Sequence, residues 1–176
     1  MTCFHGSYGY TKPDIAAPGS YITSAAVATG SNSVTFSGTS MAAPYVTGSA
    51  ALVMQSHPSY TPAQVKSALM NTATHDVRTE SGAVYAVDRV GAGRVDTLAA
   101  VQSKSLVYNA DKSGTVSLSF GVLEYAPDAG AQTLTREVTV ENTDSVAHTY
   151  ALSYAESTNI PGVEYSFPSS VTLAPG

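Results

Sequence analysis

One stretch of this 176-residue chain limits the folds open to it more than any other. Residues 33–36, Ser-Val-Thr-Phe, predict the end of a strand. A Gly-Thr-Ser turn at residues 38–40 follows, and residues 41–56 predict a helix of small and apolar side chains with no polar face of any size. A helix of that kind is normally buried on all sides. The fold therefore has to be organised around this helix.

Ser40 lies where the predicted strand passes into the helix. At a helix N-terminus the unpaired backbone N–H groups and the positive end of the dipole favour developing negative charge. An acyl-transfer nucleophile needs that environment, because its oxyanion hole commonly includes a backbone amide. The Gly-Thr-Ser sequence alone is more typical of an ordinary N-cap serine. Catalysis by Ser40 is therefore a hypothesis that the flanking residues have to support.

Two motifs beside Ser40 support it. Residues 38–44 are Gly-Thr-Ser-Met-Ala-Ala-Pro, and residues 12–19 are Lys-Pro-Asp-Ile-Ala-Ala-Pro-Gly. In this order and spacing, the two motifs closely resemble the subtilisin-like serine proteases. The resemblance implies an α/β fold with a parallel sheet and a buried helix, with Ser40 as the nucleophile and its own N–H as one oxyanion donor. Tyr45 departs from the family, which usually has a histidine after the proline, but that histidine is not the triad base.

Composition narrows the classes of partner. The net charge is −5, from 8 Lys and Arg against 13 Asp and Glu, and no basic stripe exists, so we expect no nucleic-acid partner. No apolar run approaches the ~18 residues of a membrane-spanning helix. The lone cysteine, Cys3, cannot form an internal disulfide. The first residues lack signal-peptide features, yet the low charged fraction of 12% and the resemblance favour an extracellular or cell-surface location.

Further signals extend the resemblance over residues 1–102, which we expect to be the C-terminal portion of a subtilisin-like peptidase domain. Residues 22–27 predict a buried strand. The Thr-Pro-Ala-Gln sequence at residues 61–64 predicts the capping box and first turn of a second helix. The Gly-Ala-Gly-x-Val-Asp block at residues 91–96, with a short helix over residues 97–101, resembles the segment that closes the catalytic domain.

From residue 105 the pattern changes to an alternation with a period of two, which is typical of short strands. Strands are predicted at residues 115–120, 134–140, 148–154, 163–168 and 171–173. Strands of this length and spacing favour a β-sandwich. The region resembles the fibronectin type III-like modules that follow the catalytic domain in larger secreted subtilisin-like proteases. We expect residues 105–176 to be such a sandwich, cut short at the Ala-Pro-Gly end.

The difficulty for catalysis is the proton acceptor that Ser40 needs. The chain has four histidines. His57 is 17 residues along the helix, or roughly 25 Å at 1.5 Å per residue. His75 falls in a polar loop and His148 in the predicted sandwich, while His5 is near in the sequence without a supporting motif. None of the four is assigned as the base.

In subtilisin-like proteases the triad Asp and His and an oxyanion-hole Asn lie upstream of both motifs, and the 39 residues before Ser40 show no counterpart. Asp14 is interpreted as a structural turn carboxylate. We therefore expect a fragment that is inactive alone and leaves much of the apolar helix uncovered. The implied partners are a polypeptide substrate and the missing N-terminal part of the domain. No cofactor is expected, and calcium, which the resemblance allows in the full-length enzyme, has no evident ligand spacing here.

Two other functions fit parts of the sequence. In an α/β-hydrolase the nucleophile is followed by Asp and then His, and Asp96 and His148 stand in that order. Ala42 in place of the second elbow glycine, and an all-β second half, count against that interpretation. The other alternative is a non-catalytic scaffold or adhesion module, whose helical half packs against a partner while the sandwich acts as a spacer.

Overall fold

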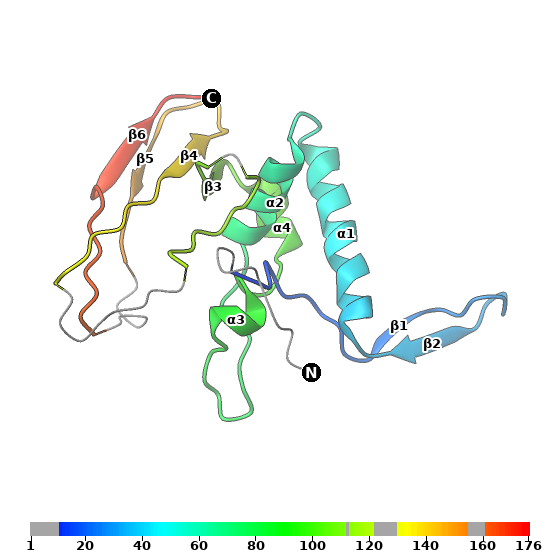
Figure 1. The fold of residues 1–176 in the computed structure, drawn as a ribbon. Coiled ribbons are helices and arrows are strands. Elements are labelled where there is room, and N and C mark those ends of the chain that lie inside the picture. The colour runs from blue at the N-terminus through cyan, green and yellow to red at the C-terminus, as the bar shows by residue number, and fades with distance from the viewer. Residues whose placement is uncertain (1–10, 112, 122–129, 155–160) are drawn as a thin grey trace.

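The computed structural model describes residues 11–111, 113–121, 130–154 and 161–176 (Figure 1). Helix α1 stands beside the shorter helices α2 and α4, the hairpin of β1 and β2 projects from the beginning of α1, and β3 to β6 lie on the other side of α2. In chain order the elements are β1 (Ile22–Ala25), β2 (Ser33–Phe36), α1 (Thr39–Ser56), α2 (Pro62–Asn71), α3 (Val87–Val90), α4 (Thr97–Gln102), β3 (Ser105–Asn109), β4 (Val138–Asn142), β5 (His148–Ala151) and β6 (Ser170–Leu173).

The predicted helices are confirmed, because their signals are local. Helix α1 ends at Ser56, as predicted, and begins two residues earlier than expected, at Thr39. Helix α2 has the predicted capping box: the Thr61 N–H donates to Gln64 Oε1 at 2.9 Å, and the Gln64 N–H donates to Thr61 Oγ1 at 3.3 Å. Asp96 caps α4 by accepting from the Ala99 N–H at 2.9 Å.

One small core joins helices α1, α2 and α4 to β3. Its buried side chains are Val53, Val65, Ala68, Leu69, Val95, Ala100 and Leu106. Leu106 belongs to β3, yet its side chain has no exposed surface and packs with residues of the helices. Met70 on α2 is also buried, whereas Met54 on α1 is 56% exposed and does not fill the core.

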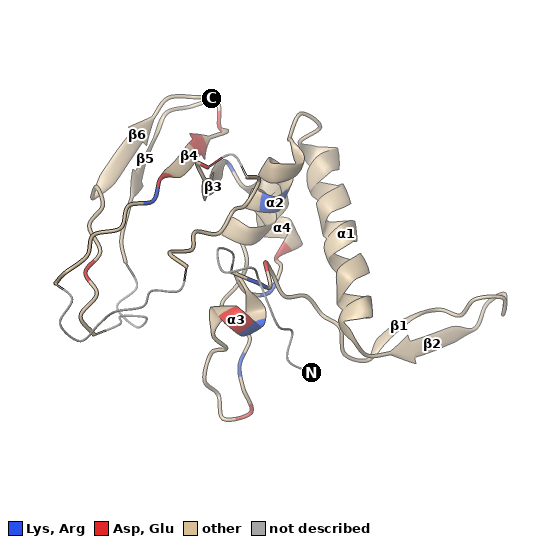
Figure 2. Ribbon diagram, viewed as in Figure 1, with Lys and Arg blue, Asp and Glu red and all other residues tan. Residues whose placement is uncertain are grey.

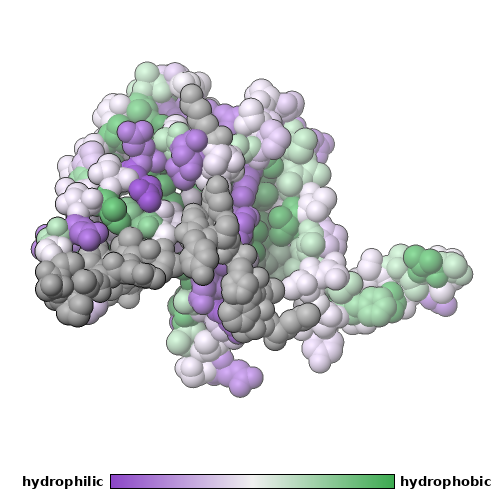
Figure 3. All heavy atoms as spheres, viewed as in Figure 1, coloured by the Kyte–Doolittle hydropathy of each residue, from purple (hydrophilic) through white to green (hydrophobic). Residues whose placement is uncertain are grey.

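Much of α1 is uncovered, as predicted for the isolated chain. Only Ser49 and Val53 of this helix are buried, while Tyr45, Leu52 and Met54 are each about half exposed. Figure 3 shows hydrophobic side chains along the helix and on the projecting hairpin. The chain exposes 12440 Å² in all, whereas a compact monomer of its mass, 18.1 kDa, exposes about 8100 Å². The chain therefore carries far more surface than its own core requires.

The first strands differ from expectation. Strands β1 and β2 pair with each other in antiparallel register, from Ile22 opposite Phe36 to Ala25 opposite Ser33. The strand predicted to be buried is mostly exposed, and Val27 beyond its end is 92% exposed. The expected parallel sheet is not found in the described ranges, where parallel pairing is limited to one bridge, Ala16 with Arg94. A short connection between two strands gives an antiparallel hairpin, whereas parallel pairing needs strands joined by long crossovers.

That bridge is part of a tight backbone junction. The Gly93 carbonyl accepts from the Ala16 N–H at 2.8 Å, and on the other side the N–H and carbonyl of Arg94 pair with Thr74 at 2.9 and 2.8 Å. A Cβ at Gly93 would collide with the Thr74 carbonyl, and one at Gly91 with the Asp14 carbonyl. Glycine is therefore required at both positions for the backbones to approach this closely.

In the described part of the second half, β3 pairs with β4 and β5 pairs with β6, as two separate two-stranded antiparallel sheets. The strand predicted at residues 134–140 begins only at Val138, and residues 115–120 and 163–168 form no strand. The buried side chain of Asn142 joins the two sheets, because its Nδ2 donates to the carbonyls of Val146 at 2.8 Å and Leu173 at 3.2 Å. The predicted β-sandwich stays a prediction, since these pairs do not form its two layers.

Polar contacts attach β3 and β4 to α2. The Asn71 carboxamide pairs with Val107 as a neighbouring strand would, with its Oδ1 accepting from the N–H at 2.7 Å and its Nδ2 donating to the carbonyl at 3.0 Å. Gln64 Nε2 donates to both carboxylate oxygens of Glu141, at 2.9 and 3.1 Å. The helix therefore covers one edge of this sheet and holds the second half against the first.

Replacing Leu106 by Ala tests whether β3 belongs to the helical core. We expect the free energy of unfolding to fall by about 2–5 kcal/mol, because the substitution leaves a cavity in a fully packed site. The matched control is Val107→Ala on the opposite face of the same strand, where the side chain is 38% exposed, with an expected loss below about 1 kcal/mol. Urea unfolding measures both, and equal losses would contradict the shared core.

The Asp144 carboxylate predicts an acid-sensitive turn between β4 and β5. A hydrogen bond from His148 at 2.8 Å is the main cause that holds the pKa of Asp144 well below its usual value of 3.8, and the Ser145 amide and Lys104 add to it. A lowered carboxyl pKa stabilises the fold above pH 4, and this stability is lost as the pH falls below that value. We therefore expect the melting temperature to fall below pH 4.

Asp144→Asn removes that titration. The variant should melt at a lower temperature than the unmodified chain at pH 6, and the two curves should approach each other near pH 2. Asp88→Asn, at an exposed carboxylate on α3, serves as the control. A constant difference between the Asp144 variant and the unmodified chain across this range would refute the proposed linkage.

Candidate active site

Ser40 is the second residue of α1, and its side chain is exposed. The backbone N–H groups of the first helical turn have no carbonyl of a preceding turn to pair with. Ser40 therefore lies among the leading amides of an 18-residue helix, at the positive end of its dipole. This is the placement that a hydroxyl needs if negative charge is to develop beside it.

The interpretation of Ser40 as an N-cap residue is wrong. The N-cap is Gly38, two residues earlier, and no side chain caps this end of the helix. The Ser40 hydroxyl has no hydrogen-bond partner among the described residues. The hydroxyl is therefore accessible, since it is neither used as a cap nor buried by packing.

The turn before Ser40 is held by the segment after Pro18. The Gly38 N–H donates to the Gly19 carbonyl at 2.7 Å, and the Tyr21 N–H donates to Ser37 Oγ at 2.8 Å. Local sequence patterns do not reveal these contacts, because they join residues far apart in the chain. Gly19 and Ser37 are therefore the residues of this site that sequence reasoning missed.

The described histidines are engaged elsewhere. His57 lies at the far end of α1, where its Nε2 shares a 2.8 Å hydrogen bond with the Val101 carbonyl and its ring stacks on Tyr60. His148 pairs with Asp144, and His75 is exposed in the segment after α2. None of these three hydrogen-bonds to Ser40. The fourth histidine, His5, lies outside the described residues.

Carboxylates near the front of the chain have structural partners. Asp14 contacts Lys12 at 2.6 Å and Lys66 at 3.1 Å, so its structural role comes from lysines and not from the backbone amides that we expected. Partial burial raises the pKa of Asp14, but the hydrogen bonds from Lys12 and Lys66 outweigh burial and lower it. Asp96 is occupied as the cap of α4. The structure therefore brings neither Asp96 nor His148 of the α/β-hydrolase alternative to Ser40.

The segment of the chain around Ser40 has no charged side chains. Residues 15–65 contain no Lys, Arg, Asp or Glu, and Figure 2 shows that α1 and the β1–β2 hairpin carry no charged side chain. Further along the chain, Arg94 pairs with Asp76, whose pKa is lowered to about 2 mainly by the hydrogen bond from Arg94. Backbone amides are therefore the main source of positive potential that the segment around Ser40 itself provides.

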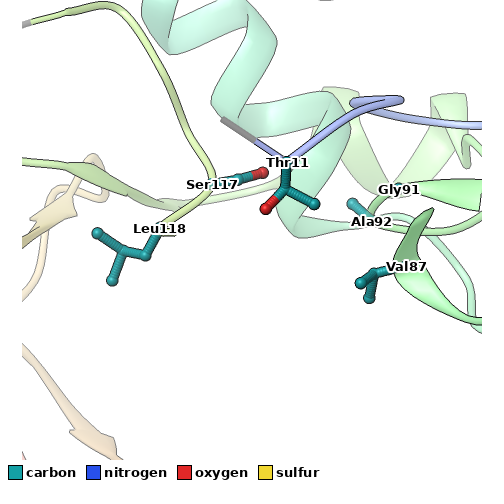
Figure 4. A pocket seen from close by; sticks show the side chains of 6 residues that line it. All are labelled: Thr11, Val87, Gly91, Ala92, Ser117 and Leu118. Atoms are coloured by element: carbon teal, nitrogen blue, oxygen red, sulfur yellow. The ribbon is translucent and has the colours of Figure 1, made fainter. Parts of the chain in front are cut away.

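Other kinds of site are not evident in the described part of the chain. No three His, Cys, Asp or Glu side chains gather there in a way that could hold a metal ion. No helix of those residues is long and apolar enough to cross a membrane. A cavity of about 190 Å³ lies away from Ser40 and has no ionisable group in its lining. Figure 4 shows its lining residues: Thr11, Val87, Gly91, Ala92, Ser117 and Leu118.

Comparison with known proteins gives consistent matches. The sequence model described as the Subtilase family matches residues 3–122. Minor extracellular protease Vpr of Bacillus subtilis (strain 168) is 33% identical over 167 residues, which are 92% of this chain and 19% of that protein. Subtilisin-like protease SBT2.6 of Arabidopsis thaliana is 54% identical over 71 residues, 36% of this chain and 9% of that protein. An extracellular serine proteinase of Thermus sp. (strain Rt41A) is 51% identical over 69 residues, 39% of this chain and 17% of that protein. The chain thus spans about a fifth or less of each of these relatives.

A cysteine probe tests the environment of Ser40 in this chain. In a Cys3→Ser background, which removes the one natural thiol, we expect Ser40→Cys to titrate about half a pH unit below an ordinary exposed cysteine, because a helix N-terminus stabilises the thiolate. Ser56→Cys, at the last residue of the same helix, should titrate above that ordinary value. The pH dependence of alkylation by iodoacetamide measures both, and identical profiles would contradict the placement of Ser40.

Proposed function

This chain belongs to the subtilase family, and on that basis we propose that it is the nucleophile-bearing part of a serine-type endopeptidase, with Ser40 as the nucleophile. In the proposed reaction Ser40 Oγ attacks the carbonyl carbon of a peptide bond while a base takes the hydroxyl proton. The amine then leaves with a proton from that base, and water hydrolyses the acyl-enzyme. The observation that carries the proposal is the exposed hydroxyl in the first turn of α1, which has no hydrogen-bond partner among the described residues. The reaction needs no cofactor.

The helix N-terminus would supply part of the oxyanion hole. The backbone N–H of Ser40 lies in the first turn of α1 and has no partner within the helix. A tetrahedral intermediate formed on Ser40 would place its oxygen beside that amide and the positive end of the dipole. The chain can therefore supply the nucleophile and one oxyanion donor from the same residue.

We propose that the base and its orienting carboxylate come from polypeptide outside the described residues. His57, His75 and His148 are held away from Ser40, and a serine without a base is a weak nucleophile. Two further observations support a large complementary partner: the uncovered apolar surface of α1, and a total exposed area about half as large again as a compact monomer of this mass needs.

The proposal also covers the class of substrate, the location of the protein and its division into domains. Polypeptide is the substrate class, and an extracellular or cell-surface location is supported by the relatives in Bacillus and Thermus, which are named as extracellular proteases. We propose that residues 1–102 belong to the peptidase domain, and that residues 105–176 form a fibronectin type III-like module attached through α2. The contacts of Asn71 with β3 support that attachment.

Labelling with a fluorophosphonate tests the catalytic role. The isolated chain should label at a barely detectable rate, because none of the described histidines is placed to activate Ser40. When the chain is extended by the upstream part of a subtilase catalytic domain, labelling should become rapid, and Ser40→Ala should reduce it by at least ~1000-fold. Ser56→Ala, at the exposed last residue of α1, is the matched control.

The same experiment separates the alternatives. Rapid labelling of the isolated chain would show that a base lies within it. Absence of labelling in the extended protein, together with retained binding of the upstream part to α1, would favour a non-catalytic scaffold. Labelling that survives Ser40→Ala would overturn the assignment of the nucleophile.

A further inference from the structure

The segment Gly19–Tyr21 makes two hydrogen bonds to the turn that carries Ser40. The Gly19 carbonyl accepts from the Gly38 N–H at 2.7 Å. Two residues later, the Tyr21 N–H donates to Ser37 Oγ at 2.8 Å. The residues joined in this way are 16 or more positions apart in the sequence. The turn is thus fastened at two adjacent positions by one short piece of chain.

Close packing accompanies these hydrogen bonds. A Cβ at Gly19 would lie 2.7 Å from the Gly38 carbonyl oxygen and 3.1 Å from Ala42 Cβ. The Gly38 oxygen is the acceptor with which α1 begins, since the amides of Met41 and Ala42 donate to it at 3.0 and 3.4 Å. A side chain at residue 19 would therefore press on the carbonyl that shapes the first turn of the helix, where Ser40 lies.

The backbone of this segment has an unfavourable conformation at Tyr21. Its backbone has φ 53°, in the left-handed region that a tyrosine rarely adopts. The Tyr21 side chain is 82% exposed, so packing of the ring does not compensate. Such strain persists only where surrounding contacts impose it, and the hydrogen bond from the Tyr21 N–H to Ser37 is a contact of that kind.

We infer that Gly19–Tyr21 is a positioning strap for the nucleophile, with Gly19 and Ser37 as positioning residues of Ser40. The inference rests on the proposed role of Ser40. The strap acts through the Gly38 carbonyl and the first-turn amides, so it sets the direction in which the Ser40 side chain leaves the helix and the potential around it. Neither positioning residue takes part in the chemistry itself.

The strap can be tested in the chain as it stands, with the Ser40→Cys, Cys3→Ser protein as the reference. Adding Gly19→Ala should move the alkylation midpoint of Cys at position 40 most of the way back to that of an ordinary exposed cysteine. Adding Ser37→Ala should move it part of the way, because only one hydrogen bond is lost. The matched control is Gly48→Ala on the exposed side of α1, where a Cβ would meet nothing within 4 Å, and it should leave the midpoint unchanged.

Circular dichroism and melting temperature, recorded on each variant, separate positioning from stability. A residue with only a structural role would lower the melting temperature and leave the alkylation profile of the folded protein unmoved, and that result would overturn the strap. If Gly19→Ala does not fold, the Ser37→Ala variant decides the question. If Cys at position 40 of the reference protein titrates like an ordinary exposed cysteine, the result counts against the proposed role of Ser40. If its midpoint is lowered but neither Gly19→Ala nor Ser37→Ala changes it, the result counts against the strap alone.

Discussion

The structure depends on a close approach of three backbone segments that are remote in the sequence. Residues 92–95 lie between residues 14–16 on one side and Thr74 on the other, held mainly by hydrogen bonds between main-chain groups. The approach is open only because residues 91 and 93 have no side chain. Since Val95 enters the core directly after the junction, these contacts align the helices with the first part of the chain.

The same junction anchors the segment of the chain that leads to the candidate site. The chain leaves it at residue 16 and passes through Pro18 to the strap that holds the turn before Ser40. The front of α1 is therefore attached to the body through backbone contacts, while Val53 attaches the other end of the helix to the core. Between these attachments the helix presents an apolar surface without charge, which a complementary polypeptide can cover at little desolvation cost.

Features that depend on neighbouring residues were predictable, and features that depend on partners were not. The capping box of α2, the end of α1 and the short helix α4 follow from side chains within four residues of each terminus. The apolar run at residues 22–27 did not reveal that β1 pairs with β2 or that these residues are exposed. Such a run is also typical of a strand buried between two layers, and in the described part of this structure no layers cover it. The alternation in the second half likewise indicated strands but not which residues pair.

By itself, the sequence determined the family, the position of Ser40 at the beginning of an apolar helix, and the helices with strong local caps. These are properties of short segments, in which propensity and capping act over a single turn. The tertiary structure alone decided that Gly38 and not Ser40 is the N-cap, that Gly19 and Ser37 hold the turn, and that Leu106 joins the helical core. Each of these depends on contacts between residues distant in the chain, and their geometry follows from how the segments pack together.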